Sequence, residues 1–225
     1  MKKITFSFDD GVTQDARLIE LMNRYGLKGT FNLNSGLLGR EDYIVRQGRK
    51  ISHKKVRVEE VKCLYAGHEV AVHTLTHPDL TIMTDDEIVR QTEQDRKALS
   101  ALVGYEVIGM SYTGGGKNYS ERVVERIRTS TGIRYARTIE HSYDFRKNSD
   151  LLQVQPTARC SDFETLLPLA ESFLSRQTDE SALLYIWGHS FDFDVDESWN
   201  VLEDFFSMIA HKDDIWYCTN REALL

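Results

Sequence analysis

Short apolar segments alternate with amphipathic segments along the whole chain, and this alternation limits the fold more than any other feature of the sequence. Residues 4–8 are rich in β-branched and aromatic side chains, which is typical of a strand, and residues 13–25 have the spacing of a helix. Strand and helix in turn predict a parallel sheet with helices outside. Such a sheet closes into a β/α barrel or stays open and doubly wound, and in both folds active groups lie at the carboxyl ends of the strands.

The pattern predicts roughly eight strands and about six helices in a single domain, residues 1–225. We expect the strands at residues 4–8, 29–34, 69–74, 106–112, 133–138, 152–157, 182–189 and 215–219. We expect the helices at residues 13–25, 56–65, 84–103, 120–130, 162–176 and 198–211. Residues 36–52 are polar and have no clear period, so a long loop is expected there.

Charge and apolar content exclude several kinds of partner. The 28 Lys and Arg residues against 35 Asp and Glu give a formal net charge of −7, which should repel nucleic acids and anionic membranes. No apolar run approaches the roughly 18–20 residues of a membrane span, and no leader-like segment precedes the first strand. We expect a cytoplasmic protein, although a secreted chain with its leader removed would look the same. The sequence gives no indication of oligomeric state.

The cysteines do not form a disulfide or zinc-binding pattern. There are three of them, Cys63, Cys160 and Cys218, and they are scattered and include no Cys-x-x-Cys. We expect three reduced, largely buried thiols.

Two acidic residues, Asp9 and Asp10, directly follow the first strand. Adjacent carboxylates at the end of an apolar strand repel each other and lose hydration, which raises a pKa unless a cation compensates. The pair therefore suggests a metal site, a proton-transfer site or both. A cap at the start of the following helix is the alternative.

A second strand end carries His73 and His77, in the segment His-Thr-Leu-Thr-His-Pro. Two imidazoles four residues apart on one helical turn lie on the same face and can bind one divalent ion. With one carboxylate from the acidic pair they form a three-ligand set that leaves positions for water and substrate, as catalytic sites do. We expect one divalent ion, Zn²⁺ first, while Fe²⁺, Co²⁺ and Ni²⁺ stay open.

A third strand end carries His189, after the apolar residues 183–187. A histidine there titrates near neutral pH and can protonate a leaving group, with Asp192 or Asp194 beside it; a structural histidine is the alternative. We expect the remaining histidines to be ordinary surface residues: His53, His68, His141 and His211. Residues 113–118 are rich in glycine but lack key residues of a phosphate loop, so we expect a substrate-side loop.

Two of these segments resemble the first two motifs of the polysaccharide deacetylase family, which is carbohydrate esterase family 4 or the NodB-like domain. They are Ser7-Phe8-Asp9-Asp10-Gly11 and His73-Thr74-Leu75-Thr76-His77-Pro78. Ile186 to Asp192 is similar to the family's last motif, so the resemblance covers nearly the whole chain. It implies a distorted β/α barrel and a metal-dependent hydrolase that removes an N- or O-acetyl group from a sugar.

The resemblance also implies the roles of single residues. It assigns metal binding to Asp10, His73 and His77, general-base catalysis to Asp9 and general-acid catalysis to His189. Because residues 109–112 fall where the family has an Arg-x-Pro-Tyr-like motif, it implies that the backbone N–H of Tyr112 helps hold the oxyanion.

The third and fourth motifs depart from the family pattern. Gly109 takes the place of the arginine that orients the base, and Arg137, at the end of the fifth strand, is our candidate from topology to replace it. Trp187 stands where a smaller apolar residue usually shapes the acetyl pocket, so the acyl group accepted is open. We expect Tyr112 and Trp187 to line the substrate pocket. Residues 143–145 are at best a remnant of the fourth motif.

The leading hypothesis is a metal-dependent deacetylase whose partner is an acetylated sugar or oligosaccharide. Two alternatives stay open. One is hydrolysis of a small non-sugar amide or imide by the same residues, and the other is a carbohydrate-binding domain with impaired catalysis, which Gly109 suggests. An iron(II) oxygenase is disfavoured, because its usual β-sandwich lacks this alternation of strands and helices.

Overall fold

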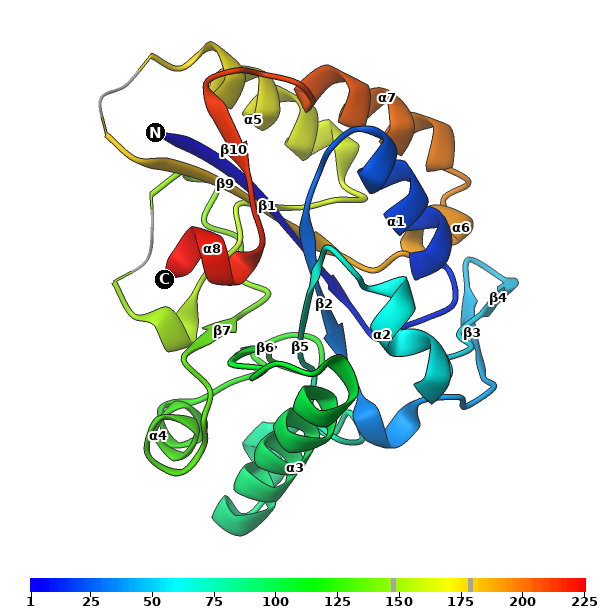
Figure 1. The fold of residues 1–225 in the computed structure, drawn as a ribbon, viewed down its shortest axis with the longest axis vertical. Coiled ribbons are helices and arrows are strands. Elements are labelled where there is room, and N and C mark those ends of the chain that lie inside the picture. The colour runs from blue at the N-terminus through cyan, green and yellow to red at the C-terminus, as the bar shows by residue number, and fades with distance from the viewer. Residues whose placement is uncertain (147–148, 178–179) are drawn as a thin grey trace.

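The computed structural model describes residues 1–146, 149–177 and 180–225. A curled parallel sheet runs through the molecule and helices pack around it (Figure 1). The strands are β1 (Lys2–Asp9), β2 (Gly29–Leu33), β3 (Tyr43–Arg46), β4 (Arg49–Ser52), β5 (Glu69–Val72), β6 (Gly109–Ser111), β7 (Tyr135–Arg137), β8 (Ala158–Arg159), β9 (Ala182–Gly188) and β10 (Ile215–Tyr217). The helices are α1 (Asp15–Arg24), α2 (Val61–Leu64), α3 (Asp85–Val103), α4 (Glu121–Ser130), α5 (Phe163–Ser175), α6 (Asp192–Val195), α7 (Trp199–Ile209) and α8 (Asn220–Leu224).

β1 is the centre of the sheet. It pairs in parallel with β2, β9 and β10, and the full strand order is β7-β6-β5-β2-β1-β9-β8. Every residue of β1 except Lys3 is buried, because helices cover one face of the sheet and the interior of the curl covers the other. The predicted alternation of strands and helices is therefore confirmed.

The segment before and within β8 joins the two edges of the curled sheet. The Val154 carbonyl accepts a hydrogen bond at 2.9 Å from the Thr138 N–H, next to β7, while the Thr157 N–H donates to the Tyr185 carbonyl of β9 at 2.7 Å. These bonds close the sheet into a distorted β/α barrel, as the family resemblance implied. The strand expected at residues 152–157 is mostly this irregular connection, and only two residues after it form β8.

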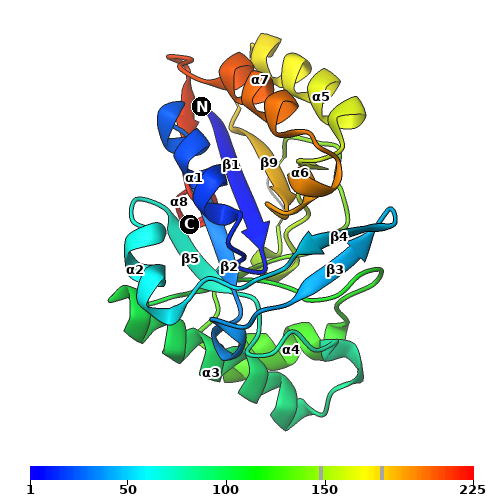
Figure 2. The same ribbon diagram turned by 90° about the vertical axis from the view of Figure 1, so that its right-hand side faces the viewer.

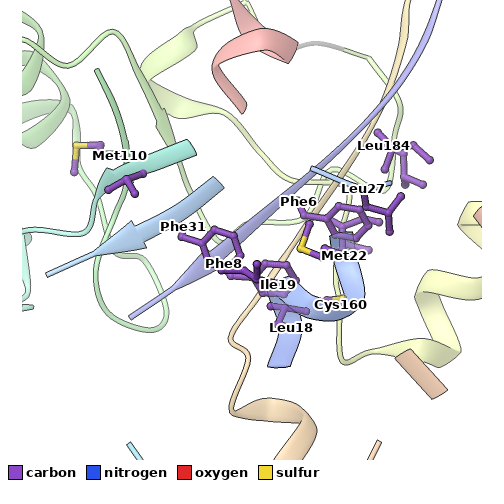
Figure 3. Packing of buried hydrophobic residues seen from close by; sticks show 14 of the residues in the cluster. Phe6, Phe8, Leu18, Ile19, Met22, Leu27, Phe31, Met110, Cys160 and Leu184 are labelled. Atoms are coloured by element: carbon purple, nitrogen blue, oxygen red, sulfur yellow. The ribbon is translucent and has the colours of Figure 1, made fainter. Parts of the chain in front are cut away.

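Aromatic side chains fill the core between β1, β2 and α1 (Figure 3). Phe8 stacks on Phe31 of β2 with ring centroids 5.9 Å apart, and Phe6 lies on the same side of β1. Leu18 and Met22, one helical turn apart on α1, are fully buried against them. Burying each of these side chains stabilises the fold by about 1.5–3 kcal/mol, which holds β1 in place.

α8 covers the amino-terminal end of the barrel. Thr5 of β1 donates to the Asn220 side chain at 2.9 Å, and the Arg221 N–H donates to buried Glu69 at 2.9 Å. The carboxyl ends of the strands are left at the opposite end, where the predicted site residues lie.

Residues 36–52, expected to be a loop, contain a β-hairpin formed by β3 and β4. The hairpin projects beside α6 and the carboxyl end of β1 (Figure 2). Its strands are mostly exposed, so they lack the apolar alternation that marks a half-buried strand.

All three cysteines are free, but Cys63 is exposed, which corrects the expectation of three largely buried thiols. In the part of the chain that the structure describes, no helix is both long and apolar enough to span a membrane.

Candidate active site

A cavity of about 440 Å³ lies at the carboxyl ends of β1, β5 and β9. The predicted ligand, acid–base and pocket residues all line it: Asp9, Asp10, His73, His77, Tyr112, Trp187 and His189. We call this cavity the cleft. Residues from four remote parts of the sequence therefore meet at one place, as the positions of the strand ends require.

The three predicted metal ligands lie close enough to share one ion. Asp10 Oδ1 is 3.6 Å from His77 Nε2 and 3.9 Å from His73 Nε2, and one ligand atom from each residue lies within 4.8 Å of the others. Zinc bonds of about 2.0–2.2 Å place tetrahedral ligand atoms about 3.3–3.6 Å apart, so a small adjustment brings the three onto an ion. Burial lowers the pKa of His73 to about 4, which keeps this imidazole neutral, the form that binds metals.

The backbone at this site is strained, and the predicted helical turn is wrong. Asp10 has φ 82° and His77 has φ 60°, both in the left-handed region that costs a non-glycine residue about 1–2 kcal/mol. His73 and His77 lie in a loop in which Thr74 also has positive φ, and the Thr74 hydroxyl accepts a hydrogen bond from the His77 N–H at 3.1 Å. This turn brings the two imidazole rings to 4.9 Å.

Asp9 is buried beside the ligands and surrounded by donors. Its Oδ1 accepts hydrogen bonds from Asn32 at 2.8 Å, from the Ser111 hydroxyl at 2.9 Å and from Arg137 at 2.5 Å, and Arg137 also contacts Oδ2. Burial alone would raise the pKa of Asp9, but the Arg137 charge, with a smaller contribution from His73, lowers it below its usual value. Asp9 is thus held as a carboxylate.

Arg137, the predicted replacement for the family's arginine, contacts Asp9. Its guanidinium is fully buried, donates to the Ser7 hydroxyl at 3.1 Å and lies 4.6 Å from the Trp187 ring centroid. Gly109, where the family pattern has its arginine, pairs with Tyr135 on β7, and a Cβ there would overlap the Tyr135 ring. The family's arginine therefore has no room at residue 109 of this chain.

His189 faces Asp10 from the end of β9. Its Nδ1 lies 3.4 Å from Asp192 Oδ2 and its Nε2 lies 4.0 Å from Asp10 Oδ2. Burial would lower the pKa of His189, but the hydrogen bond and charge of Asp192 raise it above the usual value. Asp194, the other predicted partner, instead accepts a bond from the Trp199 indole at 2.7 Å. The Asp192 carboxylate therefore favours the protonated form of His189 at the cleft.

Tyr112 and Trp187 both line the cleft, as expected for the substrate pocket. The Tyr112 N–H, however, donates to the Arg137 carbonyl at 3.0 Å within the pairing of β6 and β7. This geometry does not support the predicted oxyanion role of that N–H, which is already used. The Trp187 indole donates to His141 at 2.8 Å and so has a fixed orientation.

His53 and Lys55 were missed, and both touch Asp10. His53 Nε2 lies 3.2 Å from Asp10 Oδ2, while the buried Lys55 ammonium donates to the Asp10 carbonyl at 2.7 Å and lies 3.4 Å from Oδ1. Burial would raise the pKa of Asp10, but the His53 hydrogen bond and the Lys55 charge hold it well below its usual value. The expectation that His53 is an ordinary surface residue is wrong, since the hairpin returns it to the cleft.

The other unassigned histidines divide into three kinds. His141 holds Trp187, and His68 is buried and accepts the Gly29 N–H at 3.2 Å, so neither is an ordinary surface residue. His211 is exposed as expected. The glycine-rich loop lies where it was expected, since Gly114 and Gly115 line the cleft.

Solved structures of several proteins share this fold. A deacetylase from Streptococcus pyogenes in complex with acetate is 18% identical with a TM-score of 0.53, and the match covers 66% of this chain and 61% of that one. A family 4 acetyl xylan esterase from Clostridium thermocellum in complex with a cobalt ion is 14% identical with a TM-score of 0.57, covering 98% and 89%. A family 4 pseudoenzyme from Bacillus anthracis is 16% identical with a TM-score of 0.56, covering 100% and 65%.

The chain spans less than two thirds of the length of the streptococcal deacetylase, and these low identities establish the fold alone. The comparison with curated proteins gives no significant match. Membership is shown by the polysaccharide deacetylase family model, which matches residues 1–136, more than half of the chain. By this match, together with the barrel and its strand-end residues, the chain belongs to the polysaccharide deacetylase family.

Proposed function

We propose that this chain is a metal-dependent hydrolase that removes an acetyl group from a carbohydrate. The observation that carries the proposal is the arrangement of the cleft. Asp9, a carboxylate paired with Arg137, faces the ligand set around Asp10. His189, an imidazole paired with Asp192, faces the same set. Base, acid and metal ligands at one cavity are the parts that acyl hydrolysis needs.

The donor set fits a divalent cation. One carboxylate oxygen and two imidazole nitrogens, from Asp10, His73 and His77, suit Zn²⁺, Co²⁺, Ni²⁺ or Fe²⁺. A cation there would act as a Lewis acid that polarises the acyl carbonyl and makes a water molecule more acidic. The Ser111 carbonyl, 3.1 Å from His73 Nδ1, fixes that ring so that its Nε2 points to Asp10.

Asp9 is placed to start the reaction as general base. Arg137 keeps its carboxylate ionised, and Oδ1 is occupied by three donors, so Oδ2 is the oxygen better placed to accept a proton. The attacking water gives a proton to Asp9, and the water oxygen bonds to the acyl carbon. The electron pair of the C=O double bond moves to the carbonyl oxygen.

His189 is placed to complete the reaction as general acid. When the tetrahedral intermediate collapses, the bond from the acyl carbon to the sugar nitrogen or oxygen breaks, and the leaving atom takes the proton from His189 Nε2. Asp192 steadies the imidazolium before this transfer. Acetic acid, which ionises to acetate, and the deacetylated sugar leave. Asp9 then returns its proton to solvent and His189 takes a proton from solvent.

The two alternatives make different predictions. A domain with impaired catalysis has a precedent in this fold, since one similar structure is a pseudoenzyme. Against it stands the full set of Asp9, Asp10, His73, His77 and His189 around one cleft. A small non-sugar amide would use the same residues, and only substrate profiling separates that activity from sugar deacetylation.

The test measures acetate released from N-acetylglucosamine oligomers and acetylated xylan by protein loaded with Zn²⁺ or Co²⁺. We expect Asp9→Asn to lower kcat by about 10²–10⁴-fold, because the base is lost, while elemental analysis still finds one ion per chain. The exposed Asp213→Asn serves as the matched control and should keep full activity.

A double substitution of His73 and His77 to alanine should lose the ion altogether. Release of no acetate from any acetylated glycan by fully loaded protein would contradict the proposal. Full activity of Asp9→Asn would contradict the role of the base.

A further inference from the structure

The β3–β4 hairpin forms one wall of the cleft. Alternate residues of β3 point to opposite sides: Ile44 and Arg46 line the cleft, whereas Tyr43 and Val45 are 53% and 59% exposed. The alternation of side chains along β3 therefore places Arg46, and not Val45, toward the substrate.

The hairpin is attached firmly to the segment after β9. Arg49 pairs with Glu197 at 2.9 Å, and Ile44 and Ile51 pack with Phe191, which also lines the cleft. Arg46 is therefore held at the rim of the cleft by an anchored strand pair and does not sit on a free loop.

The charges of the cleft do not balance. Each carboxylate that lines it has a cation of its own: Asp9 has Arg137, Asp10 has Lys55 at 3.4 Å, and Asp192 has Arg159 at 2.8 Å. Arg46 donates to the Val45 carbonyl at 3.2 Å, and no carboxylate in residues 1–146, 149–177 or 180–225 forms an ion pair with it. When these three partners are counted, Arg46 is a fourth cation against three carboxylates at the cleft, in a chain whose net charge is −7.

Arg159 adds a second donor that the protein leaves partly unused. Its Nη2 donates to both Asp192 oxygens at 2.8 Å and its Nε donates to Oδ2 at 3.3 Å. Across the described part of the chain no acceptor takes a hydrogen bond from Nη1, and the side chain is 38% exposed at the cleft. A guanidinium has five N–H groups in a fixed plane, so Nη1 is available to a ligand.

We propose that the substrate is an acidic sugar: an acetylated glycan with a carboxylate that Arg46 and Arg159 Nη1 bind. This inference rests on the proposed deacetylase function and names the class of its substrate. A planar carboxylate matches guanidinium groups by charge-assisted hydrogen bonds, whereas a neutral sugar leaves Arg46 without a charged partner. Phe191 and Trp187 supply apolar ring surface beside it for the sugar.

The test compares two substrates that differ only in charge. One is an N-acetylated oligosaccharide that contains a uronic acid, and the other is the same oligosaccharide after reduction of its carboxyl group to an alcohol. We expect kcat/KM to be about tenfold higher for the acidic glycan, the factor that one charge-assisted hydrogen bond supplies. The ratio should fall as ionic strength rises, because Arg46 is exposed.

Substitution of Arg46 tests whether this residue causes the preference for the acidic glycan. Arg46→Gln should bring the ratio of the two kcat/KM values close to one, while Lys50→Gln, on the same hairpin and stacked over Tyr43 at 3.7 Å, should leave the ratio unchanged. We test Arg46 because Arg159 also positions Asp192, so its removal would disturb His189 as well.

Equal rates on the two glycans, or an unchanged ratio in Arg46→Gln, would overturn the inference and leave deacetylation intact. If neither glycan releases acetate, the proposed function fails, and binding of both glycans to Asp9→Asn by calorimetry still decides the acid preference. Tighter binding of the acidic glycan supports it, and equal binding overturns it.

Discussion

Arg137 reaches Asp9, the proposed general base, from a strand that is separated from β1 by β6, β5 and β2. Its guanidinium crosses the interior of the barrel, stacks on Trp187 and bonds to both oxygens of Asp9. A bidentate pair fixes the orientation of the carboxylate as well as its charge. The position of this arginine therefore fixes the direction in which the Asp9 carboxylate faces the cleft.

We expect Arg137→Lys and Arg137→Ala to lower kcat by about 10–100-fold with little change in KM, because the base loses its orientation while the substrate surface stays. Added guanidinium should restore part of kcat in Arg137→Ala by entering the vacated space beside Trp187. Steady-state kinetics of both variants, with and without guanidinium, check this.

The control is Asp9→Asn, which guanidinium should not rescue. A variant that raises KM and keeps kcat would show that Arg137 serves substrate binding and does not orient the base.

Single residues of the site differ in how visible they are in the sequence. Asp9, Asp10, His73, His77 and His189 lie at or just after the ends of predicted strands, so the topology alone brings them together. His53 follows an exposed hairpin with no apolar period, and no local pattern indicates that the chain returns there to Asp10. Contacts formed by such returns depend on packing, which a local pattern does not encode.

At the scale of elements, the pairing of β6 with β7 explains why the arginine has moved. Gly109 pairs with Tyr135, whose ring occupies the space that a side chain at residue 109 would need and whose hydroxyl donates to buried Glu69 at 2.7 Å. Two residues further along the same pair, Ser111 faces Arg137. β7 therefore supplies both the ring that fills the space beside Gly109 and, two residues further along, the arginine.

Gly109→Ala should destabilise the protein by about 1–3 kcal/mol, because a Cβ there overlaps a buried ring that cannot move freely. Urea unfolding of the variant and the parent checks the free energy of unfolding. Gly115→Ala is the control, since a Cβ at Gly115 meets nothing within 4 Å and should change the stability little. Equal stability of the two variants would show that Tyr135 moves aside.

Element boundaries set by tertiary contacts could not be predicted from local periodicity. Periodicity identified α3, with its Thr84 cap accepting the Glu87 N–H, almost to the residue. It missed the β3–β4 hairpin, whose strands are exposed, and it assigned a helical turn to a loop in which Thr74 and His77 have positive φ. A left-handed residue at a ligand is maintained by the surrounding structure, so the residues themselves do not indicate it.

At the scale of the whole molecule, buried carboxyl groups make stability depend on pH. Asp15 accepts hydrogen bonds from Ser190 at 2.6 Å and Tyr65 at 2.7 Å, yet burial raises its pKa from 3.8 to about 7. A raised acid pKa means that the folded state binds more protons than the unfolded state between these values. The contribution to stability is full below pH 3.8 and is lost as the pH rises through about 7.

Relative to Asp15→Asn, we therefore expect the parent protein to lose free energy of unfolding as the pH rises from about 5 to about 7, by up to about 1.4 kcal/mol per pH unit. Urea unfolding at several pH values, in chelator so that no ion contributes, measures the difference. Other titrating groups are common to both proteins and cancel. Asp213→Asn should run parallel to the parent, and a difference independent of pH would contradict the raised pKa of Asp15.

The overall architecture was predictable because alternation of strands and helices is repeated along the chain and each repeat adds to the signal. The closure of the barrel could not be predicted, because it depends on residues 154–159. These residues form only a two-residue strand and a few backbone hydrogen bonds. Such a connection has no periodicity, and its position follows from the curl of the other strands.

That closure has a consequence for when the protein can act. The Arg137 guanidinium that holds Asp9 extends from β7, the strand at one side of this closure, whereas Asp9 ends β1, across the barrel interior. If the connection between β7 and β9 opens, Arg137 no longer reaches Asp9. The proposed base then loses its orientation, even though Asp10, His73 and His77 keep their positions at the ends of their own strands. Completion of the ring and readiness for chemistry are then a single event.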